Sequence, residues 1–193
     1  MIRVVIVDDH PALRAGLRAV LDAEPGIVFA GESTGEEEHI WPLLNRSRPD
    51  FVLLDYHLPR GDGLQLCYRI KTDVPAPRVV LFTAYASPTL ALPALLARAD
   101  GVLDKGLGAR ELFEAIRRVH GGERLVPPVS RTVLEEGVGK LDSEERAIVG
   151  MLLDGASDRE VADTLRIQPR DVRHSVRRIL STLRLEVPVT TAG

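Results

Sequence analysis

The chain lacks the paired cysteines of small secreted domains and the long apolar runs of membrane-spanning proteins. It has a single cysteine, Cys67, which excludes an internal disulfide and falls in a helical pattern as a small apolar residue. No apolar run approaches the ~20 residues that a membrane-spanning helix needs. The start at Met1 leads straight into an apolar run, without the layout of a signal peptide. We therefore expect a cytoplasmic protein with no membrane partner.

An excess of charge of one sign is also lacking, because 25 lysines and arginines stand against 28 acidic residues and the net charge is −3. Overall charge therefore predicts binding neither to nucleic acid nor to a membrane, and any such role must come from local clustering. The length of 193 residues suits one large domain or two small ones, and the 45% hydrophobic content can supply a core.

Residues 1–120 alternate between the periodicity of strands and that of helices. Five βα units in this order predict an α/β fold with a doubly wound, five-stranded parallel sheet and helices on both faces. The expected strands are Ile2–Val7, Ile27–Ala30, Phe51–Asp55, Arg78–Phe82 and Gly101–Leu103, and the expected helices are Pro11–Asp22, Thr34–Arg46, Gly63–Lys71, Pro88–Arg98 and Ala109–His120.

A second, smaller unit follows the first. Residues 121–140 contain two adjacent prolines and several glycines, which is typical of a linker, and a short helix is expected around Arg131–Glu136. Residues 141–193 form the predicted second domain, and the pattern of residues 141–185 indicates helices only. The expected helices are Asp142–Leu153, Asp158–Leu165 and Pro169–Leu183.

Acidic side chains follow two of the expected strands at the point where each ends. Asp8 and Asp9 come directly after the first apolar run, and Asp55 closes the third. The carboxyl ends of parallel strands meet at one edge, where open α/β sheets bind ligands. Carboxylates packed together repel one another unless a cation or a proton lies between them. The sequence therefore predicts a divalent-metal site, and Mg²⁺ fits best because it takes carboxylate and phosphate oxygens.

Two further groups reach the same edge from the fourth and fifth expected strands. Thr83 and Lys105 would bring a hydroxyl donor and an ammonium group, which stabilise a phosphoryl group formed on a nucleophilic Asp55. Each residue alone has a simpler interpretation: Asp9 can cap the first helix, and Lys105 can be a solvated surface charge. Their joint placement at strand ends favours a phosphoryl-transfer site.

Three stretches within residues 1–120 carry a resemblance to a known family. They are VDDHPALRAGL at 7–17, DYHLPRGDG at 55–63, and ADG at 99–101 with the lysine at 105. The chain resembles the flavodoxin-like receiver domain of bacterial two-component response regulators, in particular those of the NarL/FixJ family. The resemblance implies that Asp55 accepts phosphate from a sensor histidine kinase. It also implies that Asp8, Asp9, Asp55 and the main-chain carbonyl of His57 hold Mg²⁺.

Two positions depart from the pattern of this family. Val102 stands where the family often has tyrosine or phenylalanine as a rotamer switch, and Tyr85 is bulkier than the residue that often stands there. These are the expected switch positions, and they leave open an atypical receiver that is controlled without phosphate.

The second unit resembles the LuxR-type helix-turn-helix domain that ends this family. The matching stretches are LDSEER at 141–146, GASDREVA at 155–162 and VR at 172–173. The resemblance implies a transcription regulator that binds double-stranded promoter DNA and is not an enzyme. A phosphatase of similar sheet topology is the enzymatic alternative, but nothing beyond the aspartyl-phosphate machinery suggests a substrate pocket.

The third expected helix of this unit has two distinct sides. An apolar stripe repeats at helical spacing, and the turn of about 100° per residue puts arginines on the opposite side. Charged helix faces are usually only solvated, but this one has no alternating acids, which favours DNA binding. The stripe is Val172, Val176, Ile179, Leu180 and Leu183, the arginines are Arg170, Arg173, Arg177 and Arg184, and the expected DNA-binding residues are Arg170, Arg173, His174 and Arg177.

Three observations favour an alternative, a signalling protein with weak or lost DNA binding. Residues 141–193 contain eight arginines and nine acids, whereas most DNA-binding modules are net basic. Asp171 stands where the family often has threonine, and here it can serve the helix N-terminus. Only residues 185–193 follow the third helix, and Pro188 disfavours the fourth helix that the family normally has there.

The stretch 88–98 is apolar almost all round, although a helix on one face of a sheet buries only one stripe. We expect exposed leucines there and a homodimer that uses this helix, or the fifth strand and helix beside it. The alternatives are cover by the linker or second domain of the same chain, and a dimer through the first and fifth helices.

Overall fold

The structure, a computed structural model, describes residues 1–59, 61–73 and 75–184. Its central element is a parallel sheet of five strands in the order β2-β1-β3-β6-β7. This order confirms the expected flavodoxin-like, doubly wound topology, with its switch point between β1 and β3. The strands are β1 (Ile2–Val7), β2 (Ile27–Ser33), β3 (Phe51–Asp55), β6 (Arg78–Thr83) and β7 (Gly101–Asp104).

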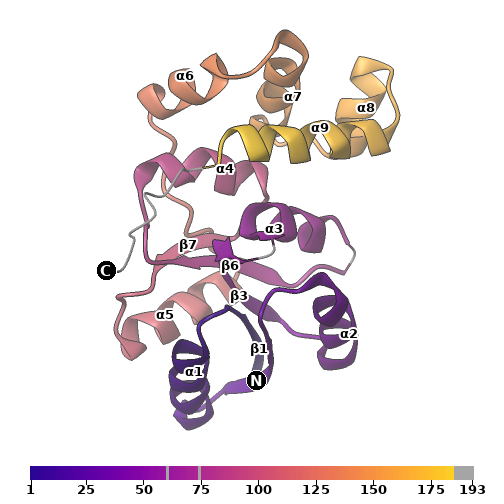
Figure 1. Cartoon of the computed structure of the whole chain (residues 1–193). Helices are drawn as coiled ribbons and strands as arrows, with labels where there is room; N and C mark the ends of the chain where they lie inside the picture. The colour runs from indigo at the N-terminus through magenta and orange to yellow at the C-terminus, as the bar shows by residue number, and fades with distance from the viewer. Residues whose placement is uncertain (60, 74, 185–193) are drawn as a thin grey trace.

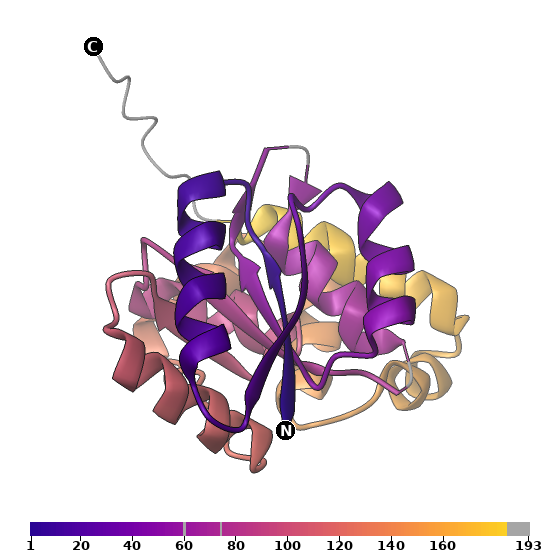
Figure 2. The same ribbon diagram turned by 90° about the horizontal axis from the view of Figure 1, so that it is seen from below.

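Helices cover both faces of this sheet (Figures 1 and 2). Helices α1 (Pro11–Ala23) and α5 (Ala109–His120) bury apolar residues such as Leu21 and Ile116 on one face. The other face is covered by α2 (Glu37–Ser47), α3 (Gly63–Thr72) and α4 (Ala91–Leu96), and a 3₁₀ turn, η1 (Pro88–Leu90), precedes α4.

Two short features were not expected from the sequence. A small antiparallel hairpin pairs β4 (His57–Leu58) with β5 (Gly61–Asp62) directly after β3. Residue 125 of the linker forms a parallel bridge with Gly101, so the linker covers the outer edge of β7. The linker is therefore not a plain spacer, although its expected helix is present as α6 (Arg131–Gly139).

The remaining helices are α7 (Ser143–Leu153), α8 (Asp158–Leu165) and α9 (Pro169–Thr182). They form the expected helical unit, and the expected apolar stripe of α9 is buried throughout. Asp171 accepts the backbone N–H of Gln168 at 3.3 Å, so it serves the helix N-terminus as expected. The absence of a fourth helix was predicted for residues 185–193, which lie outside the described residues.

The exposed leucines expected along α4 are not observed. Leu92 and Leu96 are buried, and Leu95 is only partly exposed. The reason is a second layer of helices, α6, α7 and α9, which packs over α4 from the same chain (Figure 1). A methyl group added at Gly137 of α6 would come within 2.5 Å of Leu92 Cδ2, which shows how closely the linker helix approaches α4. Within the described residues, no helix is long and apolar enough to cross a membrane.

Candidate functional site

The strand ends bring the expected carboxylates together at the switch point of the sheet. Val7 of β1 pairs with Leu54 of β3, so the residues that follow, Asp8 and Asp55, stand side by side. Both side chains are 2% exposed. Ligand atoms of Asp8, Asp9, His10 and Asp55 all lie within 4.8 Å of one another. Acidic groups this close and this buried need a cation among them.

Lys105 supplies one positive charge to this cluster. Its Nζ lies 2.7 Å from Asp8 Oδ2 and 2.8 Å from Asp55 Oδ2. The backbone fixes this position, because β7 pairs with β6 and the N–H of Lys105 donates to the carbonyl of Thr83 at 2.8 Å. The lysine is therefore held at the crevice by the sheet itself and is not a solvated surface charge.

The environment changes the protonation of both partners. Burial raises the pKa of the Asp55 carboxyl, and the hydrogen bond and charge of Lys105 offset this effect only in part. Burial alone would lower the pKa of Lys105, but its hydrogen bonds to Asp55 and Asp8 outweigh burial and raise that pKa. Lys105 thus stays charged at neutral pH, where it stabilises a buried carboxylate or any anion that is formed on it.

His57 forms a hydrogen bond to the Asp55 carboxylate, whereas Thr83 bonds elsewhere. The backbone N–H of His57 donates to Asp55 Oδ1 at 3.2 Å. Thr83 is fully buried and accepts the N–H of Tyr85 at 3.1 Å, and no hydrogen bond joins it to Asp55 within the described residues. Its hydroxyl proton remains available for donation, because a hydroxyl donates and accepts at once.

The donor set fits a hard divalent cation. Asp8 Oδ2, Asp9 Oδ1 and Asp55 Oδ2 are buried oxygens that lie beside the ammonium group of Lys105, for Asp8 and Asp55, and beside the ring of His10, for Asp9. Carboxylate oxygens of this kind are the ligands that Mg²⁺ prefers. His10 was not recognised from the sequence: its Nδ1 lies 2.8 Å from Asp9 Oδ1 and 3.1 Å from Asp8 Oδ1. Its place after two acids was the only signal for it.

The two expected switch positions differ in exposure. Tyr85 is 48% exposed, with its ring 5.9 Å from that of His57 in an edge-on arrangement. Val102 is buried in β7, and its N–H donates to the carbonyl of Leu125 in the linker at 3.1 Å. The strand that Lys105 directly follows, β7, is therefore bonded to the linker.

On α9, the structure leaves the four expected DNA-binding side chains exposed, on the side opposite the buried stripe. Part of this side faces the first unit of the same chain. Arg177 borders a cavity together with residues of α3 and of the β4–β5 hairpin. The four residues are Arg170, Arg173, His174 and Arg177.

A buried polar cluster joins the two units, and no sequence pattern pointed to it. Asp158, the first residue of α8, accepts the hydroxyl of Tyr68 on α3 at 2.6 Å and the guanidinium of Arg98 after α4 at 2.7 Å. Burial and the bond to Asp158 raise the pKa of Tyr68, so this hydroxyl stays a donor. Nearby, Gln65 donates to the hydroxyl of Ser181 at 2.7 Å. The helical unit is thus fixed to α3 and α4 by polar bonds as well as by apolar packing.

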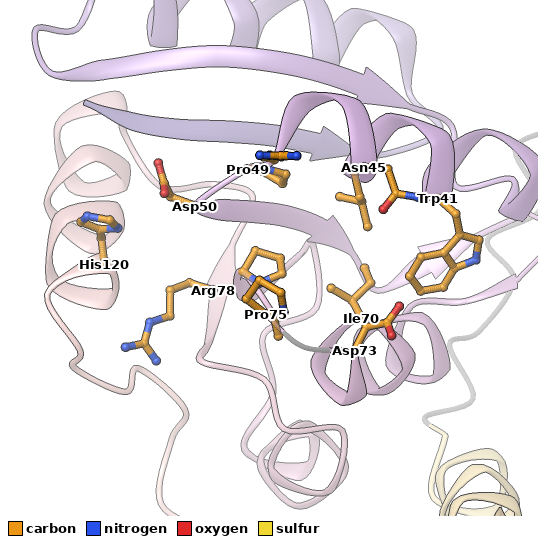
Figure 3. Close-up of a pocket in the computed structure, with 13 residues that line it drawn as sticks. Trp41, Asn45, Pro49, Asp50, Ile70, Asp73, Pro75, Arg78 and His120 are labelled. Atoms are coloured by element: carbon orange, nitrogen blue, oxygen red, sulfur yellow. The ribbon is translucent and has the colours of Figure 1, made fainter.

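A larger cavity, of about 940 Å³, lies at the opposite end of the sheet (Figure 3). Trp41 and Ile70 line one side of it, and Asp50 and Arg78 line it at the starts of β3 and β6. Two of its charged groups already have partners: Asp50 accepts the N–H of Arg3 at 2.9 Å and Arg78 donates to Asp100 at 3.1 Å. We assign this cavity no part in the chemistry at Asp55.

Comparison with known proteins agrees with this architecture. Residues 4–117 match the family model of the response regulator receiver domain. The DNA-binding transcriptional activator DevR/DosR of Mycobacterium tuberculosis is 30% identical, over 96% of this chain and 90% of its own. The nitrate/nitrite response regulator protein NarL of Escherichia coli is 28% identical, over 98% and 92%. The crystal structure of response regulator ChrA, from a heme-sensing two-component system, matches with a TM-score of 0.53 and 31% identity, over 96% and 92%. The chain therefore belongs to the NarL/FixJ family of two-component response regulators.

Proposed function

We propose that the chain is a DNA-binding transcription regulator whose receiver domain, residues 1–120, accepts phosphate on Asp55 from a sensor histidine kinase. The observation that carries this proposal is the buried convergence of Asp8, Asp55 and Lys105 at the switch point of the sheet. A linker, residues 121–140, connects the receiver to a LuxR-type helix-turn-helix domain, residues 141–193.

The chemistry assigns one role to each group. A carboxylate oxygen of Asp55 forms the bond to phosphorus as the bond between phosphorus and the donor nitrogen of the kinase histidine breaks. Lys105 then neutralises phosphoryl oxygens, and the free hydroxyl proton of Thr83 donates to one of them. Asp8, Asp9, Asp55 and the main-chain carbonyl of His57 would hold Mg²⁺. When bound, Mg²⁺ supplies further charge neutralisation to the phosphoryl group.

The exposed side of α9 is the proposed DNA reader. Arg173 and Arg177 stand four residues apart, so both can enter the major groove, while Arg170 lies nearer the helix start and can contact phosphate. Replacing Arg173 by alanine should cost about 1–3 kcal/mol at a specific site if it reads a guanine. Replacing the exposed Arg159 of α8 is the matched control.

The arrangement in Figure 1 is the proposed resting state. Because Arg177 faces the receiver domain, DNA and the receiver compete for the same side of α9. Phosphorylation would shift the population toward a state in which the helix-turn-helix domain is released. The bond between Val102 and Leu125 offers a main-chain route from β7 into the linker, in place of an aromatic switch at position 102.

We further propose that the regulator works as a homodimer. Because α4 is covered within the chain, a dimer of this resting state must use another surface. Helices α1 and α5 lie on the opposite face of the sheet, away from the helix-turn-helix domain, and remain available (Figure 1). Light scattering with and without a phosphodonor measures this directly.

A footprint on genomic DNA fragments, with and without acetyl phosphate and Mg²⁺, tests the proposed function. The proposal expects protected sites whose occupancy rises with the phosphodonor in wild type and not in Asp55→Asn. Sites that bind equally with and without the donor would indicate control without phosphate. Binding to no fragment, in either state, would favour the alternative of a protein-interaction regulator.

A further inference from the structure

The stretch VDDHPALRAGL contains one arginine, Arg14, that has no part in the chemistry assigned so far. It lies in the first turn of α1, where its own N–H donates to the carbonyl of His10 at 3.1 Å. Its side chain is only 13% exposed, although arginine is mostly exposed in proteins unless it is paired. The guanidinium is therefore held against a partner, and that partner adjoins the carboxylate cluster.

The partner is the main chain of the turn between β1 and α1. Nη1 of Arg14 donates to the carbonyl oxygen of Asp8 at 2.7 Å, the length of a charge-assisted hydrogen bond. β1 ends at Val7, and although the N–H of Asp8 still donates to the carbonyl of Ser33 on β2, the peptide group that follows lies beyond the strand. Asp9 forms no backbone–backbone hydrogen bond within the described residues. Arg14 thus holds the peptide group that stands between the two carboxylate-bearing residues.

Glu32 of β2 approaches the same guanidinium from its other side. Nε of Arg14 lies 3.5 Å from Glu32 Oε1, and the backbone of Glu32 pairs with Ile6 of β1. A planar guanidinium presents its donors in fixed directions, so it can span two groups at once. Glu32 is 38% exposed and the distance is long, so this pair orients Arg14 and adds little stability. The guanidinium therefore connects β2 to the turn that carries Asp8 and Asp9.

The position of this turn decides where two of the buried oxygens lie. Asp8 Oδ2 and Asp9 Oδ1 come from adjacent residues, so a rotation of the peptide group between them moves both. Mg²⁺ requires near-ideal octahedral directions and tolerates such movement poorly. Groups that orient metal ligands without touching the metal typically change its affinity about ten- to a hundredfold.

We propose that Arg14 is a positioning residue of the metal site, which fixes the peptide group between Asp8 and Asp9 and so directs both carboxylates toward Mg²⁺. The inference rests on the proposed function in one respect only, namely that these carboxylates hold Mg²⁺. It does not depend on DNA binding, on the kinase or on dimerisation.

The charge of Arg14 and its geometry predict opposite effects on metal binding. A positive charge beside the site repels a divalent cation, so loss of the charge alone would tighten Mg²⁺ binding. Loss of the bond to the Asp8 carbonyl would instead weaken it, because the ligands are no longer held in place. The sign of the change in affinity therefore distinguishes a positioning role from a nearby charge.

Titration of the full chain with Mg²⁺, followed by the amide signals in NMR spectra, measures this affinity. The proposal expects the dissociation constant to rise about ten- to a hundredfold in Arg14→Met. The matched control is Arg18→Met, which removes the same charge one turn further along α1, where Arg18 lies over the ring of Phe29 and near Asp22, and it should bind as wild type does. An unchanged or lower dissociation constant in Arg14→Met would overturn the proposal.

Arg14→Lys provides a second variant should the methionine variant fail to fold. It keeps the charge and most of the stem but loses the planar group, so any weakening of Mg²⁺ binding must come from geometry. We expect its dissociation constant to lie between those of wild type and Arg14→Met. Binding of Mg²⁺ by Arg14→Lys as tight as by wild type, with no weakening in Arg14→Met, leaves Arg14 without a positioning role.

The dependence of labelling on Mg²⁺ gives an independent measurement. With acetyl phosphate, the Mg²⁺ concentration for half-maximal labelling of Arg14→Met should rise by the same factor as the dissociation constant, whereas the maximal rate should fall less. A lower maximal rate with an unchanged half-saturating Mg²⁺ concentration would overturn the proposal. A wild type that binds Mg²⁺ more tightly than Arg14→Met but accepts no phosphoryl group would refute the proposed function and leave the positioning role standing, and a wild type that binds no Mg²⁺ would overturn both.

Discussion

Replacing Asp158 by alanine should release the helix-turn-helix domain from the receiver. The carboxylate accepts one hydrogen bond from Tyr68 and one from Arg98, at 2.6 and 2.7 Å. The hydrogen bond from Tyr68 to the charged carboxylate contributes about 1.5–2 kcal/mol, and the pair with Arg98 adds only about 0.5–1 kcal/mol because that side chain is 31% exposed. The closed state should lose about 2–3 kcal/mol, which raises the ratio of open to closed molecules roughly 30- to 150-fold.

Asp158 also stands at the N-terminus of α8, where a carboxylate stabilises the helix dipole by about 0.3–1 kcal/mol. That contribution is the same in open and closed molecules, so it does not enter the ratio. Asp163→Ala, which removes an exposed acid from the same helix, is the control.

Two assays follow the release. Small-angle X-ray scattering should show a larger radius of gyration for Asp158→Ala. Fluorescence anisotropy of a labelled duplex should show tighter DNA binding, and the gain in affinity can reach roughly the same 30- to 150-fold while most wild-type molecules are closed. Tyr68→Phe should produce a smaller change of the same sign. Equal scattering and equal DNA affinity for the Asp158 and Asp163 variants would refute the role of this cluster in closure.

Two further predictions concern stability. Gly63→Ala should lower the free energy of unfolding by about 1–3 kcal/mol, because the Cβ of the new alanine would collide with the backbone carbonyl oxygen of Asp55. Gly16→Ala, on the open side of α1, should raise the free energy of unfolding by about 0.5–1 kcal/mol. Urea titration of both variants measures these changes. Because burial raises the pKa of Asp55, its ionised form is disfavoured in the folded state without Mg²⁺, so Asp55→Asn should unfold at higher urea than wild type at pH 7. The difference in stability between Asp55→Asn and wild type should shrink as the pH falls through the pKa of Asp55 in the folded state, and it should vanish below the ordinary value of 3.8. Added Mg²⁺ should reduce the difference at pH 7, because it stabilises the wild type. A difference that does not depend on pH would contradict the raised pKa of Asp55.

The sequence was sufficient to predict the sheet, because each strand is a continuous apolar run. In a parallel sheet the carboxyl ends of all strands lie at one edge. That rule predicts that Asp8, Asp55 and Lys105 meet at one place. It could not identify the contact between Tyr68 and Asp158, because residues 90 positions apart in sequence share no local periodicity.

The error at α4 has a related cause. A helix that is apolar all round indicates that something covers its second side, but the pattern does not say whether the cover comes from another copy or from the same chain. The structure shows the same chain, through Gly137 and its neighbours on α6 and through α7 and α9. The β4–β5 hairpin was missed because two-residue strands are too short to show alternation.

Phosphorylation of Asp55 can be measured directly by mass spectrometry of the intact chain after incubation with acetyl phosphate and Mg²⁺. We expect a single added phosphoryl group that is stable in acid and lost in base, present in wild type and in Asp22→Asn, an exposed acid of α1, and absent from Asp55→Asn. Omission of Mg²⁺ should strongly reduce the labelling. Equal labelling of Asp55→Asn would contradict the assignment of the phosphoacceptor, and an unlabelled wild type would show that this receiver domain is controlled without phosphate.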